Sequence, residues 1–180
     1  MRRILVYGVT GSGKSTLARR VGERLGLPYH AIDDLTWEPG WVPVGDELQR
    51  DRVREICAGD EWVIDSAYGR WIDVPLGRVE LIVGLDLPRW RSFGRLLRRT
   101  VGNVVFQRPT CNGNYESWGN SLFGRESILR WHFRSFKRKQ RRMRAWHAHP
   151  EFPETVLLRS PAEVERWFAG LPSRAADGAP

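Results

Sequence analysis

Eight residues near the amino terminus have the types and the spacing of a phosphate-binding loop. The segment GVTGSGKS (8–15) matches the pattern G-x-x-x-x-G-K-[ST] at every fixed position. Its glycines allow successive backbone N–H groups to face a phosphate, while Lys14 would reach the β- and γ-phosphates and the Ser15 hydroxyl would bind Mg²⁺. An apolar segment precedes the loop and an amphipathic one follows it, which disfavours an ordinary glycine-rich turn. The pattern predicts an ATP and Mg²⁺ site formed by Gly8, Thr10, Gly11, Ser12, Gly13, Lys14, Ser15 and Thr16.

Acidic residues follow three further apolar segments. Asp33 (with Asp34 beside it), Asp65 and Asp86 each stand where a predicted strand ends. In open α/β sheets, ligands bind at the carboxyl ends of the strands, so these carboxylates are expected at the crevice that holds the loop. There a carboxylate can hold Mg²⁺ through water, orient an acceptor hydroxyl or take its proton. Each one alone could equally begin a helix or a turn, Asp86 above all.

Positive charge is concentrated in one part of the chain. The formal net charge is +8, and residues 88–144 contain 15 of the 29 Lys+Arg but 2 of the 21 Asp+Glu. Such a segment requires an anionic partner or solvent. Arginines there would stabilise charge on a transferred phosphoryl group, and the best candidates are Arg98, Arg99, Arg134 and Arg138. A solvated basic face and a surface for the phosphates of DNA or RNA remain alternatives.

Apolar periodicity predicts alternating strands and helices. Continuous apolar runs, typical of strands buried on both faces, predict strands over 3–8, 29–32, 61–65, 79–86 and 155–158. Helical spacing predicts helices over 14–25, 46–58, 88–100, 127–146 and 161–169. In the long helix we expect an apolar stripe of Leu129, Phe133, Phe136 and Met143. The alternation predicts a three-layer α/β P-loop NTPase fold, with helices on both faces of a parallel five-stranded sheet.

The remaining segments set the domain organisation. The 180 residues, 41% of them hydrophobic, fit one domain over 1–170. Residues 102–124 are rich in Gly, Asn and Ser and predict a lid, and residues 171–180 predict a disordered tail. Cys57 and Cys111 form no metal or disulfide pattern, and no apolar run is long enough for a membrane helix. We therefore expect two unpaired thiols and a cytoplasmic protein without a membrane partner.

Several segments of the first half of the chain resemble one family. They are GVTGSGKSTLAR (8–19), Asp33-x-Leu35-x-Trp37-x-Pro39-x-Trp41, Trp62-Val63-Ile64-Asp65 with Tyr68, and Arg78 before LIVGLDLPR (81–89). The loop resembles that of adenylate-kinase-like kinases of nucleotides and small molecules. Together with the Asp–Trp–Trp segment, it resembles the bacterial DNA topology modulation protein family. The second half matches only in outline, as basic helix, loop and basic helix.

The resemblance implies roles for particular residues. It implies a nucleoside-monophosphate-kinase-like fold with an acceptor-binding insertion over about 34–60 and a lid over about 102–124. Asp33 would help to hold the acceptor and Asp65 would orient Mg²⁺, although Ser66 stands where the family usually has Gly. The predicted acceptor-binding residues are Asp33, Trp37, Trp41, Tyr68 and Arg78. The aromatic rings could stack a base or cap the core of the insertion.

These observations predict an ATP-dependent phosphotransferase that acts on a nucleotide or another small acceptor. The sequence leaves the identity of this acceptor open. A nucleotide-gated regulator that binds DNA or RNA through residues 88–144 is the main alternative. A third possibility is an ATPase switch that has no phosphorylated acceptor.

Overall fold

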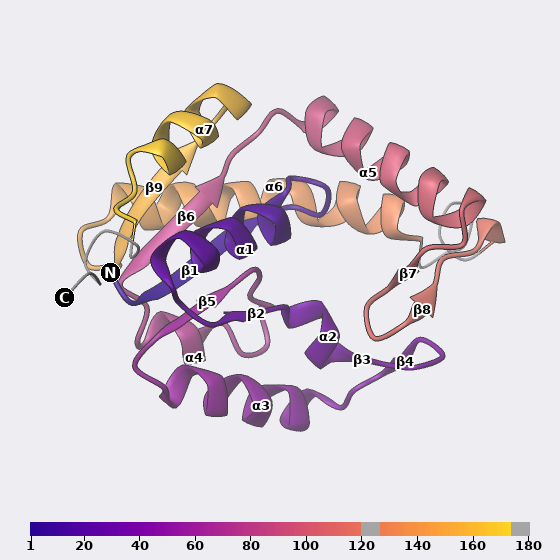
Figure 1. The fold of residues 1–180 in the computed structure, drawn as a ribbon, viewed down its shortest axis with the longest axis horizontal. Helices are drawn as coiled ribbons and strands as arrows, with labels where there is room; N and C mark the ends of the chain where they lie inside the picture. The colour runs from indigo at the N-terminus through magenta and orange to yellow at the C-terminus, as the bar shows by residue number, and fades with distance from the viewer. Residues whose placement is uncertain (120–126, 174–180) are drawn as a thin grey trace.

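A five-stranded parallel sheet lies at the centre of the molecule (Figure 1). The computed structural model describes residues 1–119 and 127–173. The strands follow the order β2-β5-β1-β6-β9, with β1 at the centre, where Leu5 lies opposite Ile64 on one side and Ile82 on the other. Their bounds are Arg3–Gly8 (β1), Tyr29–His30 (β2), Trp62–Ile64 (β5), Leu81–Leu85 (β6) and Glu154–Leu158 (β9).

Alternate side chains of β1 enter two separate cores. Ile4 and Val6 pack in the core beneath α1 (Lys14–Leu25) and α7 (Pro161–Ala169). Leu5 and Tyr7 point to the opposite face, which is covered by α3 (Asp46–Ala58) and α6 (Ile128–Ala148). Because side chains in a strand alternate between faces, a continuous apolar strand gives a three-layer structure, as predicted. Burying each large apolar side chain contributes about 1.5–3 kcal/mol.

Several short elements were not predicted from the sequence. The segment after β2 forms α2 (Ile32–Thr36), followed by the two-stranded ribbon β3 (Trp37–Glu38) and β4 (Val42–Pro43). A helical turn, α4 (Asp73–Leu76), precedes β6. The basic helix α5 runs over Arg89–Val105, further than predicted, and leads into the hairpin of β7 (Pro109–Thr110) and β8 (Asn114–Tyr115). The predicted lid therefore begins inside a helix, and its residues 120–124 lie outside the described part of the chain.

The buried face of α6 differs from the predicted apolar stripe. Phe133 is 49% exposed, and the buried side chains of the helix are His132, Ser135, Phe136, Lys139, Met143 and Trp146. Phe136 and Met143 are buried as predicted, whereas Phe133 is not, because the polar side chains of His132 and Ser135 occupy the buried face in the first half of α6.

The ordered chain continues past the predicted start of the tail. Leu171 is buried in the core under α1 and α7, and its carbonyl oxygen accepts a hydrogen bond from Arg24 Nε at 2.9 Å. Only residues 174–180 of the predicted tail lie outside the described part of the chain. No helix among the described residues is long and apolar enough to cross a membrane.

Candidate functional site

The phosphate loop joins β1 to α1 in a backbone conformation that favours glycine. Gly11 has a φ of 81° and Gly13 a φ of 94°, both in the left-handed region. Gly13 is the N-cap residue of α1, and no side chain caps this helix. The first N–H groups of α1 and the partial positive charge of the helix end are thus available to an anion. The buried side chain of Lys14, the first residue of α1, adds a full positive charge there.

The loop is packed tightly against α5. A Cβ atom on Gly11 would lie 2.4 Å from the carbonyl oxygen of Ser92, so only glycine fits. Arg95 Nη1 donates a hydrogen bond to the carbonyl oxygen of Ser12 at 3.3 Å. The hydroxyl of Ser92 lies 2.9 Å from Nε2 of His132 on α6, and burial lowers the pKa of this histidine. The conformation of the loop is therefore supported by both basic helices.

A cavity of about 440 Å³ opens beside the loop. Its other walls are Arg95 and Arg99 of α5 and Pro161 and Val164 of α7. This position, at the carboxyl ends of β1 and β6, is where parallel sheets bind ligands. Six of the eight predicted ATP-binding residues line it, namely Gly11, Ser12, Gly13, Lys14, Ser15 and Thr16. Gly8 and Thr10 stand at the entry to the loop instead.

Asp65 is held in a fixed orientation near Ser15. Its carboxylate accepts hydrogen bonds from the Tyr29 hydroxyl at 2.9 Å and from the backbone N–H of Ile32 at 3.0 Å. Burial and the Asp65 charge raise the pKa of Tyr29, and the neighbouring Ser15 hydroxyl acts in the opposite direction. A carboxylate and a hydroxyl are hard oxygen ligands, and Mg²⁺ in nucleotide sites commonly takes only one or two ligands from the protein. Ser15 and Asp65, which both interact with the Tyr29 hydroxyl, thus supply oxygen ligands of the kind that Mg²⁺ takes.

Asp86 has a different part in the structure. Its buried carboxylate accepts hydrogen bonds from Gln140 Nε2 at 2.8 Å and from Arg144 Nε at 2.7 Å. Both partners belong to α6, so Asp86 attaches this helix to the end of β6 instead of facing a ligand.

Asp33 stands at the start of α2 beside residues from three other segments. Its Oδ1 atom accepts a hydrogen bond from the Tyr68 hydroxyl at 2.6 Å. Burial, together with the Asp33 charge, raises the pKa of Tyr68 well above its ordinary value, so the phenol keeps its proton and donates it. Burial and Asp33 also raise the pKa of Cys111 to about 11, and the Asp33 charge acts on Lys139 of α6. The half-buried Asp33 thus lies where the insertion, the hairpin and α6 meet.

The hairpin of β7 and β8 is bonded to the insertion. The Asn112 side chain donates to the carbonyl oxygens of Asp34 at 2.5 Å and Trp37 at 2.7 Å. Asn114, which is 3% exposed, donates to the carbonyl oxygen of Glu38 at 3.0 Å. The hairpin and the β3–β4 ribbon lie side by side beyond the end of the sheet (Figure 1). The described part of the predicted lid therefore covers the side of the site that contains Asp33.

The two predicted tryptophans pack together at this junction. The rings of Trp37 and Trp41 meet edge to face with centroids 5.6 Å apart. The backbone N–H of Trp41 donates to Asn114 Oδ1 at 2.8 Å, and its indole N–H donates to the carbonyl oxygen of Tyr115 at 2.9 Å. Both indoles are half-buried, so they cap the junction while keeping part of each ring accessible.

The four predicted arginines do not share one environment. Arg99 lines the cavity beside the loop, and the charge of Arg138 acts on both Tyr7 and Lys139. Arg98 instead lines a second hollow of about 230 Å³ with Trp90, and Arg95 borders both this hollow and the cavity. Arg134 is exposed on α6. Helical geometry explains the difference within α5, because Arg95 and Arg99 are four residues apart and lie on one face.

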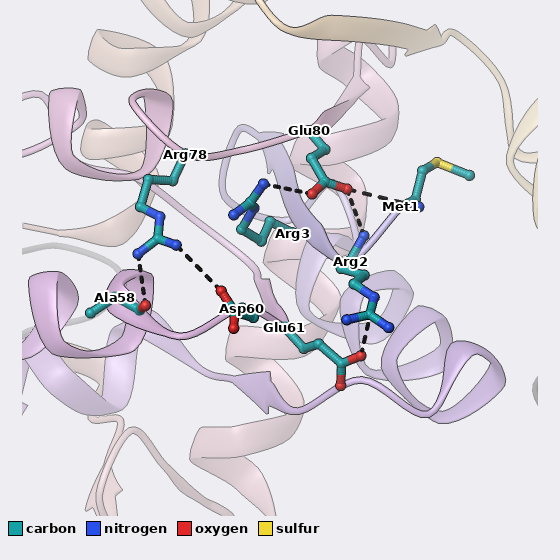
Figure 2. Close-up of polar contacts among 8 residues, drawn as sticks. All are labelled: Met1, Arg2, Arg3, Ala58, Asp60, Glu61, Arg78 and Glu80. Carbon is teal, nitrogen blue, oxygen red and sulfur yellow. Dashed lines mark hydrogen bonds and ion pairs between the residues drawn. The ribbon is translucent and has the colours of Figure 1, made fainter.

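Arg78 lies away from the site. Figure 2 shows it with residues around the start of the chain, where it donates to the carbonyl oxygen of Ala58 at 2.7 Å and lies 3.6 Å from Asp60. Arg78 precedes β6, whereas Gly8 ends the neighbouring strand β1. Because these strands are parallel, Arg78 lies at the amino ends of the strands and the loop at their carboxyl ends. This placement is incompatible with the acceptor-binding role predicted for Arg78.

Lys139 is a residue of the site that the sequence did not reveal. It is 6% exposed, and its ammonium donates to the carbonyl oxygen of Gly8 at 3.2 Å. The sequence did not distinguish Lys139 because it is one of several cationic residues in α6. Its spacing from His132, Phe136 and Met143 could have revealed it, since all four lie on one helical face.

Comparisons with known proteins find solved structures that share this fold. No family model matches the chain. Two solved structures superpose on nearly all of it, each with 18% sequence identity: a gluconokinase from Sinorhizobium meliloti 1021, covering 93% of this chain and 94% of its own with a TM-score of 0.52, and a sugar kinase from Janibacter sp. HTCC2649, covering 100% and 99% with a TM-score of 0.53. The fold is that of the P-loop kinases.

Sequence similarity extends over a shorter part of this P-loop kinase fold. The adenylate kinase of Pyrococcus furiosus is 42% identical over 57 residues, which are 32% of this chain and 25% of the relative. The adenylate kinase of Pyrococcus abyssi is 47% identical over 49 residues, which are 26% of this chain and 22% of the relative. The chain thus spans about a quarter of the length of the curated relatives that it matches.

Proposed function

We propose that this protein is an ATP-dependent kinase that transfers the γ-phosphate of ATP to a nucleotide or another small acceptor. The observation that carries the proposal is the phosphate loop, whose two left-handed glycines lead into the uncapped end of α1 beside the buried Lys14. A cavity opens on one side of this loop, and Asp33 lies on the other side, where α2 and the hairpin meet. Both the adenylate kinase relatives and the sugar kinase neighbours are named as kinases.

The donor nucleotide would occupy the loop and the adjoining cavity. Backbone N–H groups of the loop and the ammonium of Lys14 would bind its phosphates. Pro161 and Val164 offer apolar contact to a base on one side of the cavity, and Arg95 and Arg99 can stack on it or bind its phosphates from the other. Ser15 and Asp65 would hold Mg²⁺, which supplies positive charge between the β- and γ-phosphates.

The acceptor would bind beside Asp33. Its oxygen forms a bond to the γ-phosphorus while the bond from that phosphorus to the β–γ bridging oxygen breaks, and ADP leaves with the electron pair. The Asp33 carboxylate is the group at this place that can orient an acceptor hydroxyl and take its proton. Tyr68 holds one carboxylate oxygen at 2.6 Å and leaves the other for the acceptor. Accessible parts of Trp37 and Trp41 would provide apolar contact.

The experiment is a coupled assay of ATP consumption over nucleotides, nucleosides and phosphorylatable metabolites. Lys14→Ala serves as the blank, with circular dichroism to show that the fold is kept. We expect one class of acceptor to stimulate turnover and the variant to lose it. Turnover that survives in Lys14→Ala would overturn the assignment. Slow hydrolysis that no acceptor stimulates would instead identify an ATPase switch.

A second function is favoured by the outer face of α6. Arg130, Arg134, Lys137 and Arg141 are exposed at helical spacing, so this face can follow the phosphates of a nucleic acid. We also propose that this chain belongs to the DNA topology modulation family, which the Asp33–Trp41 segment resembles. A nucleic-acid-binding function is consistent with that family. Fluorescence anisotropy with duplex and single-stranded DNA and RNA tests this function. Binding that weakens steeply with salt would support it, and no binding at low salt would remove it.

A further inference from the structure

Lys139 is an unusual residue for its position in the fold. It lies on the face of α6 that packs against the sheet, and only 6% of it is exposed. A lysine is almost never buried to this extent unless its charge is paired, because an ammonium that leaves water loses a large solvation free energy. Exposed cations stand one and two residues away on the same helix, at Arg138 and Lys137. The burial of this ammonium therefore requires a reason.

The contacts of the ammonium place it at the phosphate loop. Nζ donates to the carbonyl oxygen of Gly8, the first residue of the loop, at 3.2 Å. It also lies over the rings of Tyr7 and Tyr68, 5.5 Å and 5.9 Å from their centroids. An ammonium has three N–H donors, and one bond to a carbonyl leaves donors free for a ligand. Within the described residues, Gly8 is the hydrogen-bond partner that the structure gives to Nζ.

The charges around Lys139 leave the site short of negative charge. Burial lowers the pKa of Lys139 to about 7, with repulsion from Lys14 as the next cause. Arg138 and Arg142 act in the same direction, and Asp33 acts against them. One carboxylate thus faces four cationic side chains contributed by α1 and α6. An anion bound between Lys14 and Lys139 would correct this imbalance.

We propose that Lys139 is a catalytic residue that binds the transferred phosphoryl group opposite Lys14. This inference rests on the proposed kinase function. Gly8 holds the ammonium in place, and its remaining donors bind oxygens of the γ-phosphate while the bond to ADP breaks. Lys139 takes no part in the covalent exchange. It stabilises the charge on the phosphoryl oxygens within a buried site, where a fixed donor is most effective.

The proposal distinguishes ligands that carry the γ-phosphate from those that lack it. Isothermal titration calorimetry with β,γ-imido-ATP and with ADP, each with Mg²⁺, measures both affinities. In Lys139→Met, which keeps the length of the side chain without its charge, we expect affinity for the triphosphate to fall about 10-fold or more. Affinity for ADP should change less than about 3-fold, because the proposal assigns the free donors of Lys139 to the γ-phosphate, which ADP lacks.

Two further variants separate charge from structure. Lys139→Arg keeps the positive charge and should recover part of the preference for the triphosphate. Lys137→Met removes an exposed cation two residues away on the same helix and should leave both affinities unchanged. Thermal unfolding of each variant tests whether α6 remains packed. We expect Lys139→Met to stay folded, because an apolar side chain of similar length replaces a buried charge.

Turnover provides an independent measurement. In the same coupled ATP assay, we expect kcat of Lys139→Met to fall about 100-fold, with a smaller change in the KM for ATP. Equal loss of triphosphate and ADP binding would show that Lys139 only supports the loop, and would overturn the proposal, as would unchanged kcat. A wild-type protein that binds neither nucleotide would instead overturn the kinase function on which the proposal depends.

Discussion

The two sides of the candidate site are built in different ways. On the donor side, backbone conformation within one short segment sets the geometry, through two left-handed glycines and the end of a helix. On the acceptor side, side-chain hydrogen bonds join segments more than 70 residues apart, such as Asn114 with Trp41 and Glu38. The donor side is therefore a local structure supported by its neighbours, whereas the acceptor side exists only after the chain has folded.

This difference predicts how each side responds to change. A substitution in the loop should alter both ATP binding and stability, because no neighbouring residue can adopt its role. A substitution on the acceptor side should alter the acceptor step and leave ATP binding intact. Four experiments test this comparison, in order of decreasing expected effect.

The largest effect is expected for Asp33→Asn. The amide cannot take a proton from an acceptor hydroxyl, so kcat for the stimulated reaction should fall about 100-fold or more. The affinity for ATP, measured by calorimetry, should change little, since Asp33 contributes to the acceptor side. A parallel loss of ATP affinity would mean that the two sides are not separable.

The next effect is expected for Gly11→Ala. The added Cβ would lie 2.4 Å from the carbonyl oxygen of Ser92 in a backbone conformation with a φ of 81°, so the loop must move. We expect the free energy of unfolding to fall by about 2–3 kcal/mol and ATP binding to weaken, as measured by urea unfolding and calorimetry.

A matched substitution shows whether this effect is specific to the loop. A Cβ on Gly94, in the adjacent helix α5, would meet no atom within 4 Å. Gly94→Ala should therefore stabilise the protein by about 0.5–1 kcal/mol, because glycine is unfavourable inside a helix. If both alanines behave alike, close packing of the loop on α5 is not what requires glycine at position 11.

A smaller effect is expected for Asn114→Ala. This change removes the bonds from a buried side chain to Trp41, Glu38 and Cys111, at a cost of about 1–3 kcal/mol in the docking of the hairpin. Hydrogen exchange over residues 107–116 should become faster, and the KM for the acceptor should rise. Exchange over residues 8–15 of the loop serves as the internal control and should stay the same.

The smallest effect concerns pH and Lys139. Its pKa is about 7 in the folded protein and about 10.4 in an unfolded chain. Between these values the unfolded chain holds a proton that the folded protein has released, so the free energy of unfolding should rise with pH. Below pH 7 this contribution is constant. Relative to Lys139→Met, we expect the wild type to gain about 1.5 kcal/mol from pH 7 to pH 8.5 in urea unfolding. No relative gain would show that Lys139 keeps its proton throughout this range.

Parts of the fold were predictable because their physical cause is local. The continuous apolar run of β1 and the glycine pattern of the loop depend on nearby residues, and the fold class followed from the alternation of apolar strands with amphipathic helices. The sequence did not predict the element α2 or the ribbon of β3 and β4, because they are short and depend on tertiary hydrogen bonds. One such bond runs from Ile32 to Asp65 at 3.0 Å.

The candidate residues divide in the same way. Lys14, Ser15 and the loop glycines were predicted from spacing, and the structure brings them to one cavity. Arg99 lies beside that cavity, whereas Arg98 lines another hollow. Charge and spacing could not distinguish these two residues, because the rotation of α5 about its axis decides which one faces the loop. Arg78 was predicted as an acceptor-binding residue only from the family resemblance. The direction of β6 places it at the amino ends of the strands, away from the loop.

The sequence by itself determined the phosphate loop and the layered α/β architecture, because glycine conformation, helix polarity and apolar periodicity act over a few neighbouring residues. Only the tertiary structure decided which polar groups are buried around that loop. Lys139 is one of several cations in α6, and what distinguishes it is the carbonyl oxygen of Gly8, 131 residues away in the chain. A contact over such a separation depends on how a whole helix crosses the sheet, and no local pattern records that.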